Sequence, residues 1–280
     1  MRLARGGAKG EITYLAITFS HDPKIWCVRG RKLGISLGMI ASGNDRVRRP
    51  LSRGCHAGDG MTYRIYGAAG SGSVPVEAAL TLIGAPYEVA VEAPTWEGDH
   101  QRDKVAPVNP MRQLPVLITP EGEVMTESAA ILTWLAERHP QARLAPTPGD
   151  PGRGQFLRWM SFIPASIYSL YWVRDAPARL VGDDPTAQAR VLERSAERIA
   201  ECWRIMDRQV SPGRFLTGDA IGVLDLYVAV ASRWRPMRRR FYREAPRMAE
   251  VVRRVDALPE LQAFWAARYP FEPGWEGEDI

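Results

Sequence analysis

The sequence predicts an α/β domain followed by an all-α helical domain. Residues 61–139 alternate between short strand-like runs and segments with helical periodicity. A stretch rich in proline and glycine follows at 140–154, and no convincing strand occurs after it. These three observations predict domains at 61–139 and 155–271, joined by a linker at 140–154 and followed by a tail at 272–280.

Within the first domain, strands are expected near 63–66, 87–91, 116–118 and 123–125. Helices are expected near 74–83 and 128–138, and a polar helical or loop stretch runs to residue 106. The order strand, helix, strand, helix, strand, strand, helix is that of a thioredoxin-like domain.

The second domain is predicted to be a helical bundle, with helices near 155–172, 186–210, 223–234, 245–257 and 259–269. The helix at 223–234 is almost wholly apolar and should therefore be central. Gly222 stands at its N-cap, where glycine is nearly as good as serine. We expect Asp225 to accept a hydrogen bond from the Gly222 N–H, as in a capping box.

Pro115 opens the predicted strand at 116–118. Because proline cannot donate to a sheet ladder, it is tolerated at the first residue of a strand or at an edge. A cis bond between Leu114 and Pro115 would be uncommon and would serve a purpose. It would turn the amide and carbonyl of Leu114 outward, where an extended peptide can pair with them as an added strand.

Glu127 and Ser128 directly precede the apolar residues of the predicted helix at 128–138. The free N–H groups of a helix start favour a carboxylate, and the Ser128 hydroxyl adds a donor. Glu127 would then meet an ammonium group, so the pair suits an amino-acid zwitterion such as the γ-glutamyl end of glutathione. The alternative is that both residues only cap the helix. The strand-opening proline upstream favours the binding interpretation.

From about residue 63 to residue 271 the sequence resembles the cytosolic glutathione S-transferase family, especially its bacterial members. The resemblance rests on motifs in the family's order and spacing: Tyr66-Gly67, Leu80-x3-Gly84-x-Pro-Tyr87, Asn109-Pro110, Gln113-Leu-Pro115, Glu127-Ser128 and Phe215-Leu-Thr-Gly218-Asp219 to Asp225. It implies the glutathione S-transferase fold, glutathione as cosubstrate, no metal, a homodimer and a cytoplasmic role in detoxification.

The resemblance also assigns a glutathione site. The Leu114 backbone, before Pro115, would hold the cysteinyl part of glutathione. Glu127 and Ser128 would hold its γ-glutamyl part, and Gln113 would lie alongside.

The group that activates the thiol is not evident from the sequence. A thiol titrates near 8.5, so a transferase stabilises the thiolate with a hydroxyl donor, a helix N-terminus or a cation. Gly70 and Gly72 stand where two bacterial classes have serine and cysteine, so Ser71 and Ser73 are the candidate catalytic side chains. Alternatively, both serines cap the following helix, and backbone N–H groups hold the sulfur. The loop is not a nucleotide site, because it lacks Gly-Lys-Ser/Thr and has Pro75 where a third glycine would stand.

Four aromatic residues at helical spacing could line an apolar acceptor pocket facing the thiol: Trp159, Phe162, Tyr168 and Trp172. Core packing is the other explanation of that spacing.

Composition excludes several classes of function. The chain is 45% hydrophobic and 25% charged, as in globular proteins, and no apolar run reaches the length of a membrane span. Its four His and three Cys show neither zinc-ligand nor disulfide-framework spacing. We therefore expect no membrane or metal, and a reducing compartment. The basic run Trp234 to Arg240 is expected to lie beyond the C-terminal end of the central helix, where its cations are favoured and remain solvated. We do not expect it to form a nucleic-acid-binding patch.

The net charge of +5 belongs to the first 60 residues, which hold 11 Lys and Arg against 4 Asp and Glu. Residues 61–280 hold 26 against 28, so nucleic-acid binding by the body is not expected. The sequence indicates that residues 1–60 are a disordered basic leader or an over-long start, rather than a targeting signal, since the apolar stretch near Leu15 is short.

The leading hypothesis is a glutathione transferase that conjugates the glutathione thiolate to a small hydrophobic electrophile. A second is a non-catalytic protein that binds glutathione or a hydrophobic ligand. A third is a glutathione-dependent reductase or peroxidase, which would need glutathione itself as the redox thiol because the loop has no cysteine.

Overall fold

The computed structural model describes residues 62–277. The predictions for residues 1–60 therefore lie outside the described part of the chain. Within residues 62–277, no helix is both long enough and apolar enough to cross a membrane.

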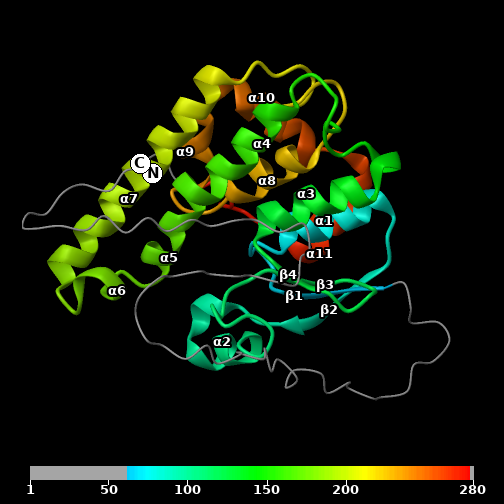
Figure 1. The fold of residues 1–280 in the computed structure, drawn as a ribbon. Helices are drawn as coiled ribbons and strands as arrows, with labels where there is room; N and C mark the ends of the chain where they lie inside the picture. Colours follow the sequence, from blue (N-terminus) through cyan, green and yellow to red (C-terminus); the bar gives the residue numbers. More distant parts are fainter. Residues whose placement is uncertain (1–61, 278–280) are drawn as a thin grey trace, which may run out of the picture. The chain divides into compact units, whose positions relative to one another are not determined.

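A four-stranded mixed sheet forms the first half of the described body, in the order β2-β1-β3-β4 (Figure 1). β1 (Tyr63–Gly67) pairs parallel to β2 (Tyr87–Glu92) and antiparallel to β3 (Val116–Ile118), which pairs antiparallel to β4 (Val124–Thr126). The last strand lies one residue beyond the predicted range, a shift typical of element boundaries. The bond between Leu114 and Pro115 is cis.

Helices cover both faces of this sheet. α1 (Val74–Ile83) and α3 (Ser128–Arg138) lie on the face toward the helical half, and α2 (Asp99–Val105) lies on the other, after a short 3-10 turn at Thr95–Glu97 (Figure 1). A small apolar cluster packs beneath α2: Ala68, Ala93, Val105, Leu114 and Val116. The predicted thioredoxin-like arrangement is confirmed.

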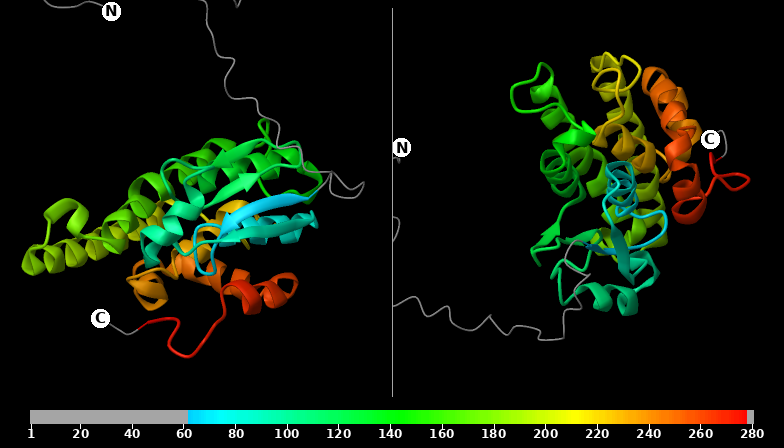
Figure 2. Two further views of the ribbon diagram at one scale, coloured as in Figure 1. Left: turned by 90° about the horizontal axis from the view of Figure 1, so that it is seen from below. Right: turned by 90° about the vertical axis from the view of Figure 1, so that its right-hand side faces the viewer.

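The second half consists of helices. They are α4 (Arg153–Phe162), a π-helical segment (Ile163–Tyr168), α5 (Ser169–Asp175), α6 (Ala178–Val181), α7 (Pro185–Gln209), α8 (Val223–Ala231), α9 (Met237–Glu244), α10 (Pro246–Asp256) and α11 (Gln262–Arg268), with 3-10 turns at Pro140–Ala142 and Pro259–Leu261. The first part of α7 lies against α5 and α6 (Figure 2).

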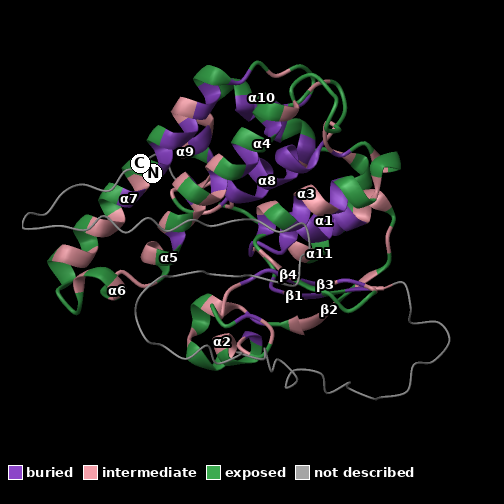
Figure 3. Ribbon diagram, viewed as in Figure 1, coloured by how far each residue is buried: buried purple, intermediate pink, exposed green. Residues whose placement is uncertain are grey.

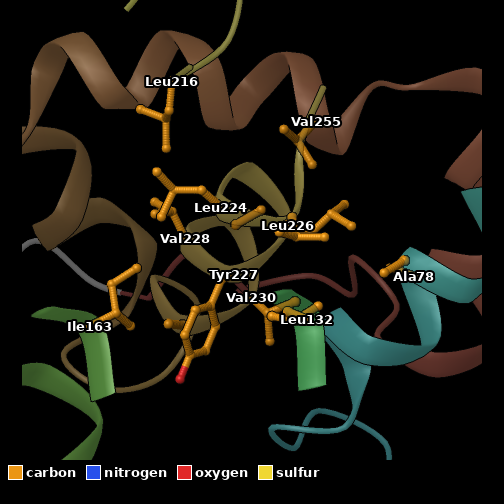
Figure 4. Close-up of a cluster of buried hydrophobic side chains, with 14 of the residues drawn as sticks. Ala78, Leu132, Ile163, Leu216, Leu224, Leu226, Tyr227, Val228, Val230 and Val255 are labelled. Carbon is orange, nitrogen blue, oxygen red and sulfur yellow. The ribbon is translucent and has the colours of Figure 1, made fainter. Parts of the chain in front are cut away.

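The core is centred on α8, as its apolar sequence predicts. Every residue of α8 is buried (Figure 3), and its side chains contact those of the surrounding helices, including Leu132, Ile163 and Val255 (Figure 4). The Asp225 carboxylate accepts the N–H groups of Gly222 and Leu216, both at 2.8 Å, so the expected reciprocal bond is confirmed.

Gly222 has a packing role that the sequence did not reveal. A Cβ at this position would lie 2.8 Å from the carbonyl oxygen of Leu144, which itself accepts the Val223 N–H. The segment between the two halves is therefore tied to the start of the central helix.

The predicted helix at 155–172 is interrupted. Pro164 has no N–H to continue the α-helical pattern and its ring crowds the preceding turn, and the Ser169 N–H reaches back five residues to the Pro164 carbonyl. Such π-segments are frequent at functional sites. This one carries Tyr168 at its end.

The expectation that the basic run near Arg240 is solvated is wrong for Arg238. Residues 237–244 form α9, and the Arg238 side chain is fully buried. Arg238 donates to the Ala229 carbonyl at the end of α8 and pairs with Asp256 at 2.5 Å. A buried guanidinium with these partners is a structural group, because its charge is neutralised within the fold.

Candidate functional site

A cavity of about 1060 Å³ lies between the sheet half and the helical half of the described body. Its lining includes all five residues proposed from the sequence to bind glutathione: Gln113, Leu114, Pro115, Glu127 and Ser128. It also includes the glycine-rich loop at 70–72. Elements distant in the sequence therefore meet at one place.

The loop before β3 is held in a fixed shape from both sides. The Asn109 side chain accepts the Met111 N–H at 3.0 Å and donates to the Gln113 carbonyl at 2.9 Å. Arg112 pairs with two aspartates of α2. Within the described residues the N–H and carbonyl of Leu114 have no hydrogen-bond partner, so they can pair with an extended ligand.

Glu127 presents an unpaired carboxylate to this cavity. It lies just before α3, its side chain is exposed, and no cation among residues 62–277 pairs with it. Its backbone has a φ of 66°, a conformation that L-residues rarely adopt and that concentrates at ligand sites. An unpaired carboxylate held in this way is suited to an ammonium ion.

Ser128 begins α3 beside the first free N–H groups of that helix. Its hydroxyl lies 2.8 Å from the hydroxyl of Tyr227, which comes from the buried helix α8. Burial raises the pKa of Tyr227 well above its usual value, so the phenol keeps its proton and can donate to Ser128. The Ser128 proton is then free for a carboxylate in the cavity.

Replacing Tyr227 by phenylalanine should weaken binding of an α-amino acid carboxylate at Ser128 by about two- to tenfold, the worth of one neutral hydrogen bond. Calorimetric titration of the full chain with reduced glutathione measures this. Tyr87→Phe is the matched control, because its hydroxyl bonds Thr81 at 3.3 Å, away from the cavity. Equal affinities in all three proteins would show that Tyr227 does not orient Ser128.

Ser71 and Ser73 form a closed hydrogen-bond network. Ser73 Oγ donates to the Glu77 carboxylate at 2.7 Å, because a carboxylate can only accept. Ser71 Oγ lies 2.9 Å from Ser73 Oγ and accepts the Ser73 N–H, and the Ala68 N–H is shared between the two oxygens. Ser71 therefore donates to Ser73, so one hydroxyl proton is used within the loop and the other bonds Glu77 of α1.

The two serines differ in their access to the cavity. Ser71 belongs to its lining, whereas Ser73 is fully buried and lies outside it. Their predicted contact with a thiol stays a prediction. The geometry favours the structural role that the sequence left open, although that role is a network with Glu77 and not a simple helix cap.

Two residues of the helical half, Trp234 and Arg268, also hold the glycine-rich loop and the helix that follows it. Glu77 is fully buried and pairs with Arg268 of α11 at 2.6 Å, and Arg268 also reaches Glu92 at 3.2 Å. The Gly70 N–H donates to the Arg268 carbonyl, while the Gly70 carbonyl accepts the indole N–H of Trp234 at 2.7 Å. Both backbone polar groups of Gly70 are therefore hydrogen-bonded to the helical half.

Comparison with known proteins identifies the family. Residues 66–143 match the model of the glutathione S-transferase N-terminal domain. Over 201 residues, 71% of this chain and 95% of the relative, the sequence is 30% identical to the uncharacterized GST-like protein YncG of Escherichia coli K12. The chain belongs to the glutathione S-transferase family.

Solved structures of this family share the fold. A glutathione transferase homologue from Sulfitobacter, with bound glutathione, matches with a TM-score of 0.64 at 18% identity, covering 74% of this chain and 98% of that one. A sphingomonad glutathione S-transferase complexed with glutathione matches with a TM-score of 0.56 at 24% identity, covering 74% and 98%. The predicted fold class is therefore confirmed.

The structure separates the four aromatic residues proposed for the acceptor pocket of this glutathione S-transferase family member. Tyr168 and Trp172 line the cavity. Trp159 is buried and packs edge-on against Phe162 with ring centroids 5.4 Å apart, and neither belongs to the lining. Helical spacing alone did not distinguish the two pairs, because it does not show which residues face the sheet domain.

Sequence reasoning missed three residues that build the site: Glu77, Tyr227 and Trp234. Two carried a weak signal, since an acid four residues after Ser73 and a tyrosine in α8 both interrupt apolar helices. Trp234 had none beyond its place in the basic run. Among the residues described, no three His, Cys, Asp or Glu side chains gather as a metal site would require.

Proposed function

We propose that this protein is a glutathione transferase, which binds glutathione in the cavity and conjugates its thiolate to a small electrophile. The observation that supports this most is the placement of the free Glu127 carboxylate beside the start of α3, in one cavity with the open Leu114 backbone. The γ-glutamyl ammonium would meet Glu127. The adjacent carboxylate would meet Ser128 and the helix N–H groups.

The cysteinyl part of glutathione would pair with Leu114, with Pro115 and Gln113 alongside. This places its sulfur toward the glycine-rich loop. Sulfur then attacks an electrophilic carbon, the leaving group departs with the bonding electron pair, and the thiol proton is released to water. Binding two reactants in one cavity is itself a large contribution to such a reaction.

The side of the cavity formed by the helical half indicates which class of electrophile it would accept. It combines Tyr168 and Trp172 with a cationic surface, since four arginines and one carboxylate of the helical half line the cavity. Arg235 is exposed there with no hydrogen-bond partner among the described residues. An aromatic or apolar electrophile with an anionic substituent would suit this wall. We also propose that the protein works as a cytoplasmic homodimer in detoxification, as the family resemblance implies.

A second candidate is a glutathione-binding protein without transferase activity. The saturated hydroxyls of Ser71 and Ser73 favour it, because neither offers a free proton to a thiolate. The third candidate is a glutathione-dependent reductase. The loop at 67–75 contains no cysteine that would support it.

The test is calorimetric titration of the full chain with reduced glutathione, followed by turnover with chlorodinitrobenzene. We expect saturable binding at one site and formation of the thioether. Binding without turnover on this and on anionic electrophiles would favour the second candidate. Absence of binding would overturn the proposal, because every later step depends on glutathione in the cavity.

A further inference from the structure

Gly72 lies where one bacterial class of the family has a cysteine, and another residue occupies the space that its side chain would take. A Cβ at Gly72 would lie 2.3 Å from the hydroxyl oxygen of Tyr168 and 3.1 Å from the ring carbon that carries it. Real Cβ atoms do not approach other atoms so closely. This position of Tyr168 therefore requires a residue without a Cβ at position 72.

Tyr168 is held against the loop by packing. Its ring contacts Trp234 edge-on, with centroids 4.9 Å apart, and Trp234 in turn donates to the Gly70 carbonyl. The π-helical segment ends at Tyr168 and turns the residue toward the cavity, whose lining includes it. Packing on a loop-bound indole leaves the ring little freedom to move away.

The Tyr168 hydroxyl is available to a ligand. It has no hydrogen-bond partner among residues 62–277. Unlike the hydroxyl of Tyr171, it is not fully buried, and Tyr168 lines the cavity. Burial of the ring, with smaller contributions from Asp175 and Glu127, raises its pKa above the usual tyrosine value. The phenol therefore stays protonated near neutral pH and remains a donor.

We propose that Tyr168, from the helical half of the chain, is the residue that donates a hydrogen bond to the glutathione sulfur, in place of a side chain from the loop at 70–73. The inference rests on the proposed glutathione site. The phenol keeps its proton throughout: the thiol proton passes to water, sulfur forms the bond to carbon, and the leaving group takes the bonding electrons. Tyr168 stabilises the thiolate before attack.

The first test compares Tyr168→Phe with the parent full chain. We expect glutathione affinity within about twofold, a pKa of the bound thiol higher by about one unit, and turnover of chlorodinitrobenzene near neutral pH lower by about 5- to 30-fold. Calorimetry measures the affinity, ultraviolet absorbance of the thiolate measures its pKa, and initial rates measure turnover.

Tyr171→Phe is the matched control, because it also removes one phenolic hydroxyl, and that hydroxyl is buried without a hydrogen-bond partner. It should leave the thiol pKa unchanged. The double variant Ser71→Ala, Ser73→Ala tests the competing donors. The proposal is overturned if the double serine variant raises the pKa of the bound thiol by about one unit while Tyr168→Phe leaves that pKa unchanged.

A double-mutant cycle gives an independent measurement. Gly72→Ala should displace the Tyr168 hydroxyl and raise the thiol pKa in the parent, but have little further effect in the Tyr168→Phe background. Additive effects of the two substitutions would contradict the proposal. Failure of the parent to bind glutathione would overturn the proposed function together with this inference, whereas binding with an unchanged pKa in Tyr168→Phe would overturn the inference alone.

Discussion

Replacing Glu127 by glutamine is expected to weaken glutathione binding by about 10- to 150-fold, the worth of a hydrogen bond to a charged group. Glutamine keeps the shape of the side chain and removes its charge. In the free protein the carboxylate is exposed and unpaired, so the substitution should leave the free energy of unfolding nearly unchanged. Loss of affinity would thus come from the lost ligand contact.

Calorimetric titration of the full chain measures this effect, with Glu123→Gln as the control. Glu123 is an exposed acid four residues away, outside the cavity lining, and its variant should bind like the parent. Glutathione acetylated on its amino group provides a second control, because it has no ammonium ion. If Glu127→Gln weakens both ligands equally, Glu127 does not contact the γ-glutamyl ammonium.

Replacing Arg268 by leucine is expected to lower the free energy of unfolding by about 3 kcal/mol, because it leaves the buried Glu77 without its cation. Glu77 is fully buried, and Arg268 is 20% exposed, which places the effect at the lower end of the range for broken buried pairs. The Ser73 hydroxyl would then donate to a carboxylate that Arg268 no longer holds. The glycine-rich loop should therefore loosen along with the fold.

Urea denaturation of the full chain measures the loss, and two variants distinguish its cause. Arg64→Leu removes a cation from a surface pair of similar length, 3.0 Å, whose side chains are 54% and 57% exposed, and should cost less than about 1 kcal/mol. Adding Glu77→Gln to Arg268→Leu should recover part of the loss, since no buried charge then lacks a partner. A double variant no more stable than Arg268→Leu would show that packing, and not charge, explains the effect.

Much of the fold could be predicted because its signals are local. Pro115 marks the start of β3, the Glu127-Ser128 pair marks the start of α3, and the apolar run after Gly222 identifies the central helix. Each depends on the backbone preferences of a few adjacent residues. The interruption at Pro164 was also a local signal, but the aromatic periodicity on either side of it suggested a continuous helix.

The candidate site was predictable in part, for the same reason. The residues proposed to bind glutathione occur in two short motifs, and the structure brings both motifs into one cavity. The buried Arg238 could not be distinguished from its exposed neighbour Arg235, because a partner such as Asp256 lies 18 residues further along the chain. Charge in a sequence does not show whether the fold supplies a counter-charge.

By itself the sequence predicted the strands and helices of the sheet half, the apolar central helix, the resemblance to the family, and the residues at the mouth of the sheet that suit a zwitterionic peptide. Only the tertiary structure decided which groups complete the site: Arg268 against Glu77, Tyr227 against Ser128, and Tyr168 against Gly72. The physical reason is that these pairs lie 191, 99 and 96 residues apart in the chain. Such contacts form only when the helices pack on the sheet, and that packing depends on side chains throughout the core.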